Sequence, residues 1–138
     1  IEPNDIVLRL TDLQNDQKSL RVGLSHERGI VTSAYLTIRP NADSIADYLA
    51  YVIKVFDFKK GFYGIGSGVR QSLKFSEVRK ILMAFPPLPE QREIAAYLDA
   101  AVSRIDAVVA RRKAQLEKLE AFKRSLIQEY VTGKREVC

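Results

Sequence analysis

The sequence predicts an α+β protein, in which a small mixed, β-rich domain precedes one long C-terminal helix with a coiled-coil seam. Three observations predict this class. Short apolar or alternating segments fill the first 40 residues, three prolines fall between positions 86 and 89, and a regular apolar spacing then continues to Gly133. We therefore expect residues 1–88 to form the domain and residues 89–138 to form the helical region.

Composition allows a folded core and excludes several kinds of site. Of the 138 residues 46% are hydrophobic, and there is one cysteine and one histidine. These counts exclude a disulfide scaffold, a zinc cluster and a Cys/His nucleophile pair. No apolar run approaches the roughly 20 residues that a membrane-spanning helix needs, and no signal segment opens the chain. We expect a cytoplasmic protein without membrane contact and, because it begins with Ile1, a piece of a longer one.

Positive charge is concentrated in the middle of the chain. Between positions 54 and 80, seven Lys and Arg residues stand against two acidic ones, and this excess equals the net charge of +5 of the whole chain. A local basic surface is typical of proteins that bind a phosphate backbone. Charge alone more often means a solvated face, so it does not decide the function.

Three strands are expected before Pro40. Residues 5–10 form a short apolar segment, and a polar loop follows over residues 11–18. Residues 19–24 and 30–39 flank a turn that contains Gly29, which predicts a hairpin between them. In the second of these strands the apolar positions 34, 36 and 38 alternate with polar ones, including Ser33 and Tyr35, so one face is expected to pack and the other to meet ligand or water.

A helix and a glycine-rich segment follow. Asp43 or Ser44 is expected to cap a helix that packs on the sheet through Ile45, Leu49, Val52, Ile53 and Phe56. Four of the seven glycines then lie between positions 61 and 68, where main-chain N–H groups can approach an anion. The spacing matches no mononucleotide or dinucleotide motif, and an ordinary flexible turn explains it equally well. Ser76 is expected to cap a short helix ending at Lys80, and residues 81–85 to form the last strand.

Residues 86–94, PPLPEQREI, convert extended backbone into helix. Prolines favour extended backbone before them, and the last one is tolerated in the first helical turn. The helix is expected from position 89 to 132, ending before Gly133, although a break near residues 99–100 stays open. A 4–3 spacing along it predicts a seam for a parallel or antiparallel partner helix. Its apolar members are Leu98, Val102, Ile105, Val109, Leu116, Leu119 and Leu126.

Both ends of this helical region resemble the specificity subunit of type I restriction-modification systems. Residues 86–95, PPLPEQREIA, resemble the signature that opens that family's conserved helical region, and residues 123–134, KRSLIQEYVTGK, resemble its end. Residues 10–16, 32–35 and 66–75 are similar to segments of its target recognition domains. The resemblance covers nearly the whole chain.

This resemblance implies a non-catalytic DNA-binding protein. In the family, two target recognition domains each bind half of a bipartite site, and two helical regions form the antiparallel coiled coil that separates them. Double-stranded DNA and the methylation and restriction subunits are the implied partners. No cofactor is expected, because the methylation subunit holds the methyl donor. This chain has one helical region and the latter part of one recognition domain, so we expect self-association or pairing with a second helical repeat.

Candidate DNA contacts come from the polar segments of the domain. Arg70 and Lys74 are expected on phosphates, and Gln71, Asn15 and Gln17 on base edges. The full expected set is Asn15, Gln17, Lys18, Arg21, Ser33, Tyr35, Gly66, Ser67, Gly68, Arg70, Gln71, Ser72 and Lys74. No catalytic residue and no metal ligand is expected.

Two other interpretations stay open. A coiled-coil adaptor with a protein-binding head and no role on DNA explains the same seam, and titration with duplex DNA at two salt concentrations separates it from a DNA-binding protein. An enzyme is less well supported. Asp12 with Asp16, or Asp43 with Asp47, offers a carboxylate pair, but neither has a neighbouring histidine or a metal motif.

Overall fold

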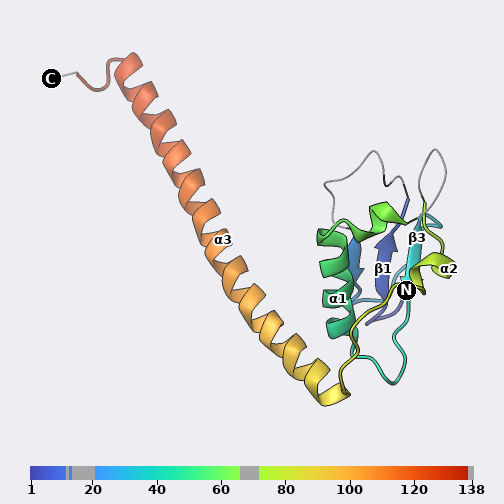
Figure 1. The fold of residues 1–138 in the computed structure, drawn as a ribbon. Helices are drawn as coiled ribbons and strands as arrows, with labels where there is room; N and C mark the ends of the chain where they lie inside the picture. Colours follow the sequence, from blue (N-terminus) through green and yellow to red (C-terminus); the bar gives the residue numbers. More distant parts are fainter. Residues whose placement is uncertain (12, 14–20, 66–71, 137–138) are drawn as a thin grey trace. The chain divides into compact units, whose positions relative to one another are not determined.

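The chain divides into two compact units. The computed structural model describes residues 1–138 except 12, 14–20, 66–71 and 137–138 (Figure 1). The first unit, Ile1–Ala96, contains a β-sheet with helices packed on it, and the second, Tyr97–Cys138, is almost entirely helix. The predicted α+β class is confirmed.

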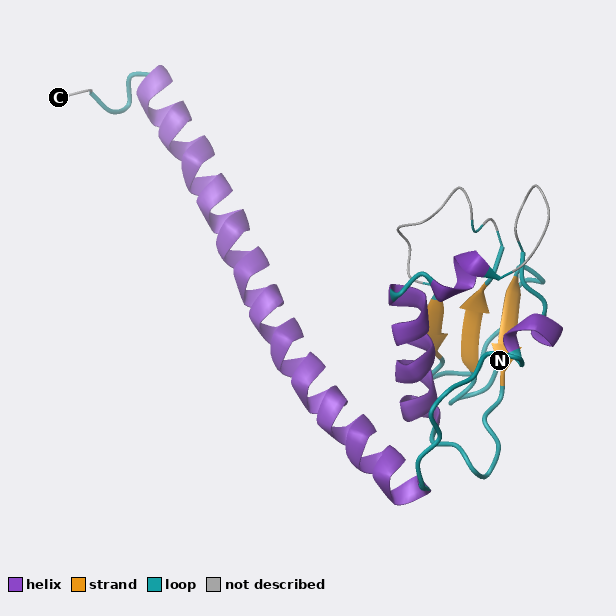
Figure 2. Cartoon of the chain, viewed as in Figure 1, coloured by secondary structure: helices purple, strands orange, loops and turns teal. Residues whose placement is uncertain are grey.

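The sheet consists of three antiparallel strands in the order β2-β1-β3 (Figure 2). They are β1 (Ile6–Arg9), β2 (Val22–Leu24) and β3 (Tyr35–Ile38). Central β1 pairs with both neighbours, and Leu8 lies opposite Val22 on one side and Leu36 on the other. The predicted hairpin between residues 19–24 and 30–39 is therefore wrong. Its two segments form opposite edges of the sheet, because the apolar β1 takes the place between them.

One face of the sheet forms the core and the other is open. Ile6 and Leu8 of β1 are fully buried, and Leu36 and Ile38 of β3 pack against the same cluster. Tyr35 and Thr37 alternate with them and are exposed, as the period of a strand requires. The alternation expected for this strand is confirmed from Tyr35 onward, whereas Ala34 precedes the strand and is exposed.

Helix α1 (Ala46–Phe58) covers the core face, as Figure 2 shows. Leu49 and Ile53 of the predicted stripe are buried and its other members are partly buried, while Tyr48 and Ala50, which were not predicted, are buried as well. The expected cap is wrong, since Ile45 is the N-cap residue and no side chain of the cap closes the helix. A 3-10 turn, η1 (Gly61–Gly64), follows, and its Phe62 is fully buried against the ring of Phe56, with the ring centroids 4.9 Å apart.

The chain after η1 completes the core with irregular structure. Helix α2 (Phe75–Val78) has Lys74 as its N-cap residue, so it begins and ends two residues earlier than the helix that Ser76 was expected to cap and that was expected to end at Lys80. Residues 81–85 do not form the expected strand. Ile81 and Met83 pack against the core while Leu82 points outward, so the segment alternates as a strand does without joining the sheet.

Helix α3 (Leu88–Val131) is continuous over 44 residues, which corresponds to about 66 Å at about 1.5 Å per residue. The predicted bounds, 89 and 132, differ from the observed ones by one residue each, and no break occurs near residue 99. Gly133 adopts a positive φ of 69°, and the N–H of Lys134 donates to the carbonyl of Glu129 (2.9 Å). This is the glycine-dependent helix end that the sequence predicted.

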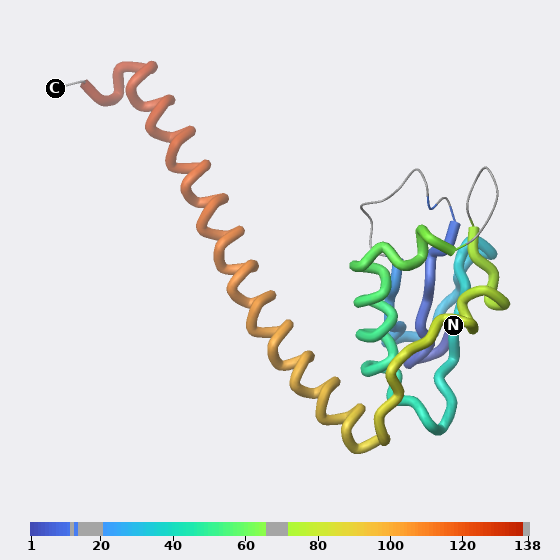
Figure 3. The backbone as a smooth tube through the Cα atoms, in the orientation of Figure 1, coloured from blue at the N-terminus to red at the C-terminus, as the bar shows by residue number. Residues whose placement is uncertain are grey.

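The first turns of α3 belong to the first unit and pack beside the start of α1. The path from α2 to α3 runs back along this unit (Figure 3), where the Tyr48 hydroxyl donates to the carbonyl of Ala84 (2.9 Å). Gln91 is buried. Its Oε1 accepts from the N–H of Ile45 (2.9 Å), and its Nε2 donates to the carbonyls of Asp43 (3.2 Å) and Pro86 (2.8 Å). Gln91 therefore supplies the cap of α1 that Asp43 and Ser44 were expected to supply.

Candidate nucleic-acid interface

Several segments of the first unit meet at the end of β1. The N–H of Arg9 donates to the carbonyl of Arg21 (2.9 Å), and on the other side Arg9 lies opposite Tyr35 of β3. One residue further, the carbonyl of Leu10 accepts from the N–H of Leu73 (2.9 Å). Arg21, which leads into β2, and Leu73, which leads toward α2, therefore lie at the same end of the sheet.

This arrangement brings together some of the predicted DNA contacts. Arg21 and Tyr35 flank Arg9, and Ser72 is exposed next to Leu73, which is buried. Lys74 is exposed as well, and its main-chain N–H donates to the Glu77 carboxylate (2.9 Å), which fixes the start of α2. Eight predicted contacts lie outside the described residues: Asn15, Gln17, Lys18, Gly66, Ser67, Gly68, Arg70 and Gln71.

The two predicted residues around β3 are exposed in different settings. Tyr35 is 42% exposed on the open face of the sheet, with its main-chain N–H bonded to the carbonyl of Thr32 (3.1 Å). Ser33 is exposed in the turn that leads into the strand. Both side chains therefore reach solvent, as the expected contact with a ligand requires.

Arg21 differs from the other predicted contacts because it is only 2% exposed. Its Nη1 donates to the carbonyls of Arg9 (3.1 Å) and Thr11 (3.0 Å), and its Nε donates to the Tyr63 hydroxyl (3.1 Å). A guanidinium has five donors in a fixed planar arrangement, and here at least three of them bind groups of the protein itself. In this conformation Arg21 lies behind the exposed surface.

Two residues of this region were not selected from the sequence. The first is Arg9, which ends the central strand between Arg21 and Tyr35. The second is Tyr63, whose ring centroid lies 5.4 Å from the guanidinium carbon of Arg21 and 5.2 Å from Nζ of Lys60. The signal for Tyr63 was its place inside the glycine-rich segment, where an aromatic ring with a polar tip ordinarily has a partner. Arg9 was hidden within an otherwise apolar strand.

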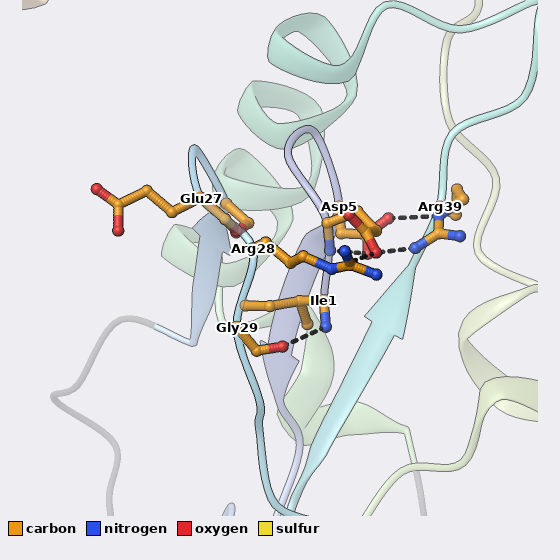
Figure 4. Close-up of polar contacts among 8 residues, drawn as sticks. Ile1, Asp5, Glu27, Arg28, Gly29 and Arg39 are labelled. Carbon is orange, nitrogen blue, oxygen red and sulfur yellow. Dashed lines mark hydrogen bonds and ion pairs between the residues drawn. The ribbon is translucent and has the colours of Figure 1, made fainter.

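The opposite end of the sheet contains a strong ion pair. Arg39 Nε donates to Asp5 Oδ1 (2.7 Å) and its Nη2 to Oδ2 (2.8 Å), as Figure 4 shows. The Arg39 guanidinium, and after it the main-chain N–H of Glu2, lower the pKa of Asp5 to about 2. Asp5 therefore stays ionised under ordinary conditions. Through its contact with Arg39, it joins the start of β1 to the end of β3.

The predicted seam is exposed along the second unit. Leu98 and Leu126 are half-buried, whereas the five seam residues between them are exposed: Val102, Ile105, Val109, Leu116 and Leu119. Phe122 and Tyr130 extend the exposed apolar surface toward the end of the helix. So many apolar side chains on one helix are typical of a surface that another helix covers.

Metal-binding clusters and membrane-spanning helices are both absent from the residues that the structure describes. Among them there is no group of three or more His, Cys, Asp or Glu side chains that could hold a metal ion. Nor does any helix in those residues have the length and apolar character needed to cross a membrane.

Comparison with known proteins identifies a family. Residues 21–118 match the type I restriction modification DNA specificity domain. The match begins at Arg21, includes β2, β3 and the helices of the first unit, and extends through most of α3. No curated protein and no solved structure matches the chain. Because the matched residues make up well over half of the sequence, the chain belongs to the type I restriction modification DNA specificity family.

Proposed function

We propose that this chain is a non-catalytic part of a type I specificity subunit that recognises one half of a bipartite DNA site. The observation that carries the proposal is the family match over residues 21–118, which includes both strand and helix. Residues 1–88 are assigned to the latter part of a target recognition domain, and residues 89–138 to the helical spacer.

The DNA-binding surface is assigned to the end of β1 and the segments that return to it. Ser72 and Lys74 are exposed on either side of Leu73, whose N–H donates to the carbonyl of Leu10, and Tyr35 is exposed beside Arg9. In this proposal Arg70 and Lys74 bind phosphates, while Asn15, Gln17 and Gln71 face base edges. Five further residues complete the proposed surface: Lys18, Ser33, Gly66, Ser67 and Gly68.

The test is the salt dependence of DNA binding by the 138-residue chain. A pool of duplexes with randomised sequence is used as the probe, because the recognised sequence is not known. The double variant Arg70→Ala with Lys74→Ala is expected to bind more weakly, and the slope of log K against log salt is expected to fall by up to about 2, since each phosphate contact contributes about 0.9.

A matched control removes the same charge from the second unit. Arg111 and Lys118 are both exposed on α3, and their double alanine variant is expected to bind DNA as the unchanged chain does. Equal losses in the two double variants would mean that only net charge matters. Unchanged binding in the Arg70/Lys74 variant would remove these residues from the surface.

The protein partners follow from the same family assignment. Methylation and restriction subunits are the proposed partners, the cytoplasm is the proposed location, and the exposed seam of α3 is assigned to pairing with a second helical repeat or a second copy of this chain.

A further inference from the structure

Arg21 occupies an unusual place for a residue that precedes an edge strand. It comes directly before Val22 of β2, yet its side chain lies inside the first unit with 2% of its surface exposed. A buried arginine requires several hydrogen bonds to offset its desolvation. The groups that provide them belong to different segments of the domain.

The guanidinium joins the end of β1 to η1. Its Nη1 donates to the carbonyls of Arg9 and Thr11 at 3.1 and 3.0 Å, and its Nε donates to the hydroxyl of Tyr63 at 3.1 Å. The Tyr63 ring also lies 5.4 Å from the guanidinium carbon, within the range of a cation–π contact. One side chain therefore fixes the last residue of β1 and Thr11, two residues beyond it, relative to η1.

The main chain of Arg21 adds a third attachment. Its N–H donates to Asp57 Oδ2 (2.8 Å), and Asp57 is 3% exposed in the last turn of α1. Its carbonyl accepts from the N–H of Arg9 (2.9 Å). Next to this network the N–H of Leu73 donates to the carbonyl of Leu10. Arg21 thus connects β1, η1 and α1 at the end of the sheet to which the DNA-binding surface is assigned.

We propose that Arg21 is a positioning residue for DNA recognition, which acts through Thr11 and Tyr63 and does not itself bind a phosphate. The proposal rests on the proposed function. Its physical basis is the shape of the arginine fork, which reaches two carbonyls and a hydroxyl in fixed directions, whereas the point charge of lysine does not reproduce that set. Replacing Arg21 with lysine therefore disturbs the geometry of the DNA-binding surface and leaves the number of positive charges unchanged.

Three variants of the 138-residue chain test the assignment. Arg21→Lys keeps the charge and removes the fork, and Tyr63→Phe keeps the ring and removes one acceptor. Arg39→Lys is the matched control, because Arg39 also makes a two-pronged contact, but at the opposite end of the sheet. The probes are a duplex that the unchanged chain selects from a randomised pool and a duplex of mixed sequence. The active fraction of each variant is measured first by stoichiometric titration.

The informative quantity is the affinity for the selected duplex divided by the affinity for the duplex of mixed sequence. Each affinity is corrected for the active fraction of the variant. For Arg21→Lys we expect this ratio to fall by roughly tenfold or more, with the salt slope unchanged because no phosphate contact is lost. Tyr63→Phe should lower it in the same direction by a smaller factor, and Arg39→Lys should leave it unchanged. Should Arg21→Lys fail to fold, Tyr63→Phe alone decides, since it leaves the buried charge in place.

Each contrary result has a distinct meaning. A salt slope reduced by about 1 in a further variant, Arg21→Gln, which removes the charge, would show that Arg21 binds a phosphate directly. An unchanged ratio in both Arg21→Lys and Tyr63→Phe would show that the network serves folding alone. If the unchanged chain selects no sequence, the proposed function itself is overturned, and this inference with it.

Discussion

Asp5 makes the stability of the first unit depend on pH at the acid end of the range. Its carboxylate is buried and bound to the Arg39 guanidinium, which lowers its pKa from the ordinary value of 3.8 to about 2. A lowered pKa stabilises the folded state at pH values above 3.8, where the unfolded chain is also ionised. That contribution is lost as the pH falls through about 2, since the carboxyl is then protonated in both states.

The substitution Asp5→Asn tests this dependence. At about pH 5 the variant should unfold at a lower urea concentration than the unchanged chain, because the charged partner of Arg39 is missing. The difference between the two midpoints should shrink steadily as the pH is lowered from 3.8 toward 2. Urea unfolding followed by circular dichroism at several pH values measures it. A difference that stays constant with pH would mean that packing, and not the charge of Asp5, stabilises this contact.

Gly61 is required because its α-carbon faces the ring of Phe56. A Cβ at this position would lie 2.5 Å from the nearest ring atom, and the ring is held edge-on against the buried Phe62. We expect Gly61→Ala to lower the free energy of unfolding by about 1–3 kcal/mol through overpacking. Gly64→Ala is the matched control in the same turn, since nothing lies within 4 Å of its Cβ. Equal midpoints for the two variants in urea unfolding would contradict the steric explanation.

At the level of elements, Gln91 joins α1 to α3. Removing its amide by Gln91→Ala leaves the N–H of Ile45 and the carbonyls of Asp43 and Pro86 without this partner. Because the site is buried, the free energy of unfolding should fall by about 1–3 kcal/mol. The neighbouring Arg92→Ala is the control, since Arg92 is exposed and its replacement should change stability by less than about 0.5 kcal/mol. Similar values for both variants in urea unfolding would show that water replaces the Gln91 contacts.

Elements governed by local chemistry were predicted well. The bounds of α3 follow from the prolines before it and Gly133 after it, which act within a few residues, whereas its continuity through residues 99–100 was left open by the sequence. The hairpin was predicted wrongly because strand pairing depends on which strand is most completely buried. That strand is β1, and it lies between β2 and β3, which were expected to pair with each other.

The candidate site was predicted less completely, for a similar reason. Exposed polar residues such as Ser72 and Lys74 are as expected, because their surroundings are polar in sequence as well. The burial of Arg21 depends on carbonyls of residues 9 and 11 and on Tyr63, which come close only in the folded domain. The capping of α1 by Gln91 was missed likewise, since 46 residues separate Ile45 from Gln91.

At the level of the whole molecule, the proposed association rests on the exposed seam of α3. Ile105 and Leu116 are 61% and 58% exposed, and they lie on the same side of the helix as Leu98 and Leu126 by the 4–3 spacing. Arg112 interrupts the seam, and its Nη1 donates to the side-chain carbonyl of Gln115 (3.0 Å) within the same helix. A polar residue in a seam lowers the stability of the pair and restricts its register.

Charge placed in the seam of α3 tests whether the seam mediates association. Replacing Ile105 and Leu116 together with aspartate should abolish self-association of the chain, because a charge at such a position must be desolvated against the partner helix. Sedimentation equilibrium measures the change, and helicity by circular dichroism shows that α3 persists. The control places aspartate at Ala107 and Ala114 on the other side of the helix, where replacing alanine costs at least as much helix propensity. Association retained by the control and lost by the seam variant assigns the interface to the seam, whereas loss in both would assign the effect to helix stability.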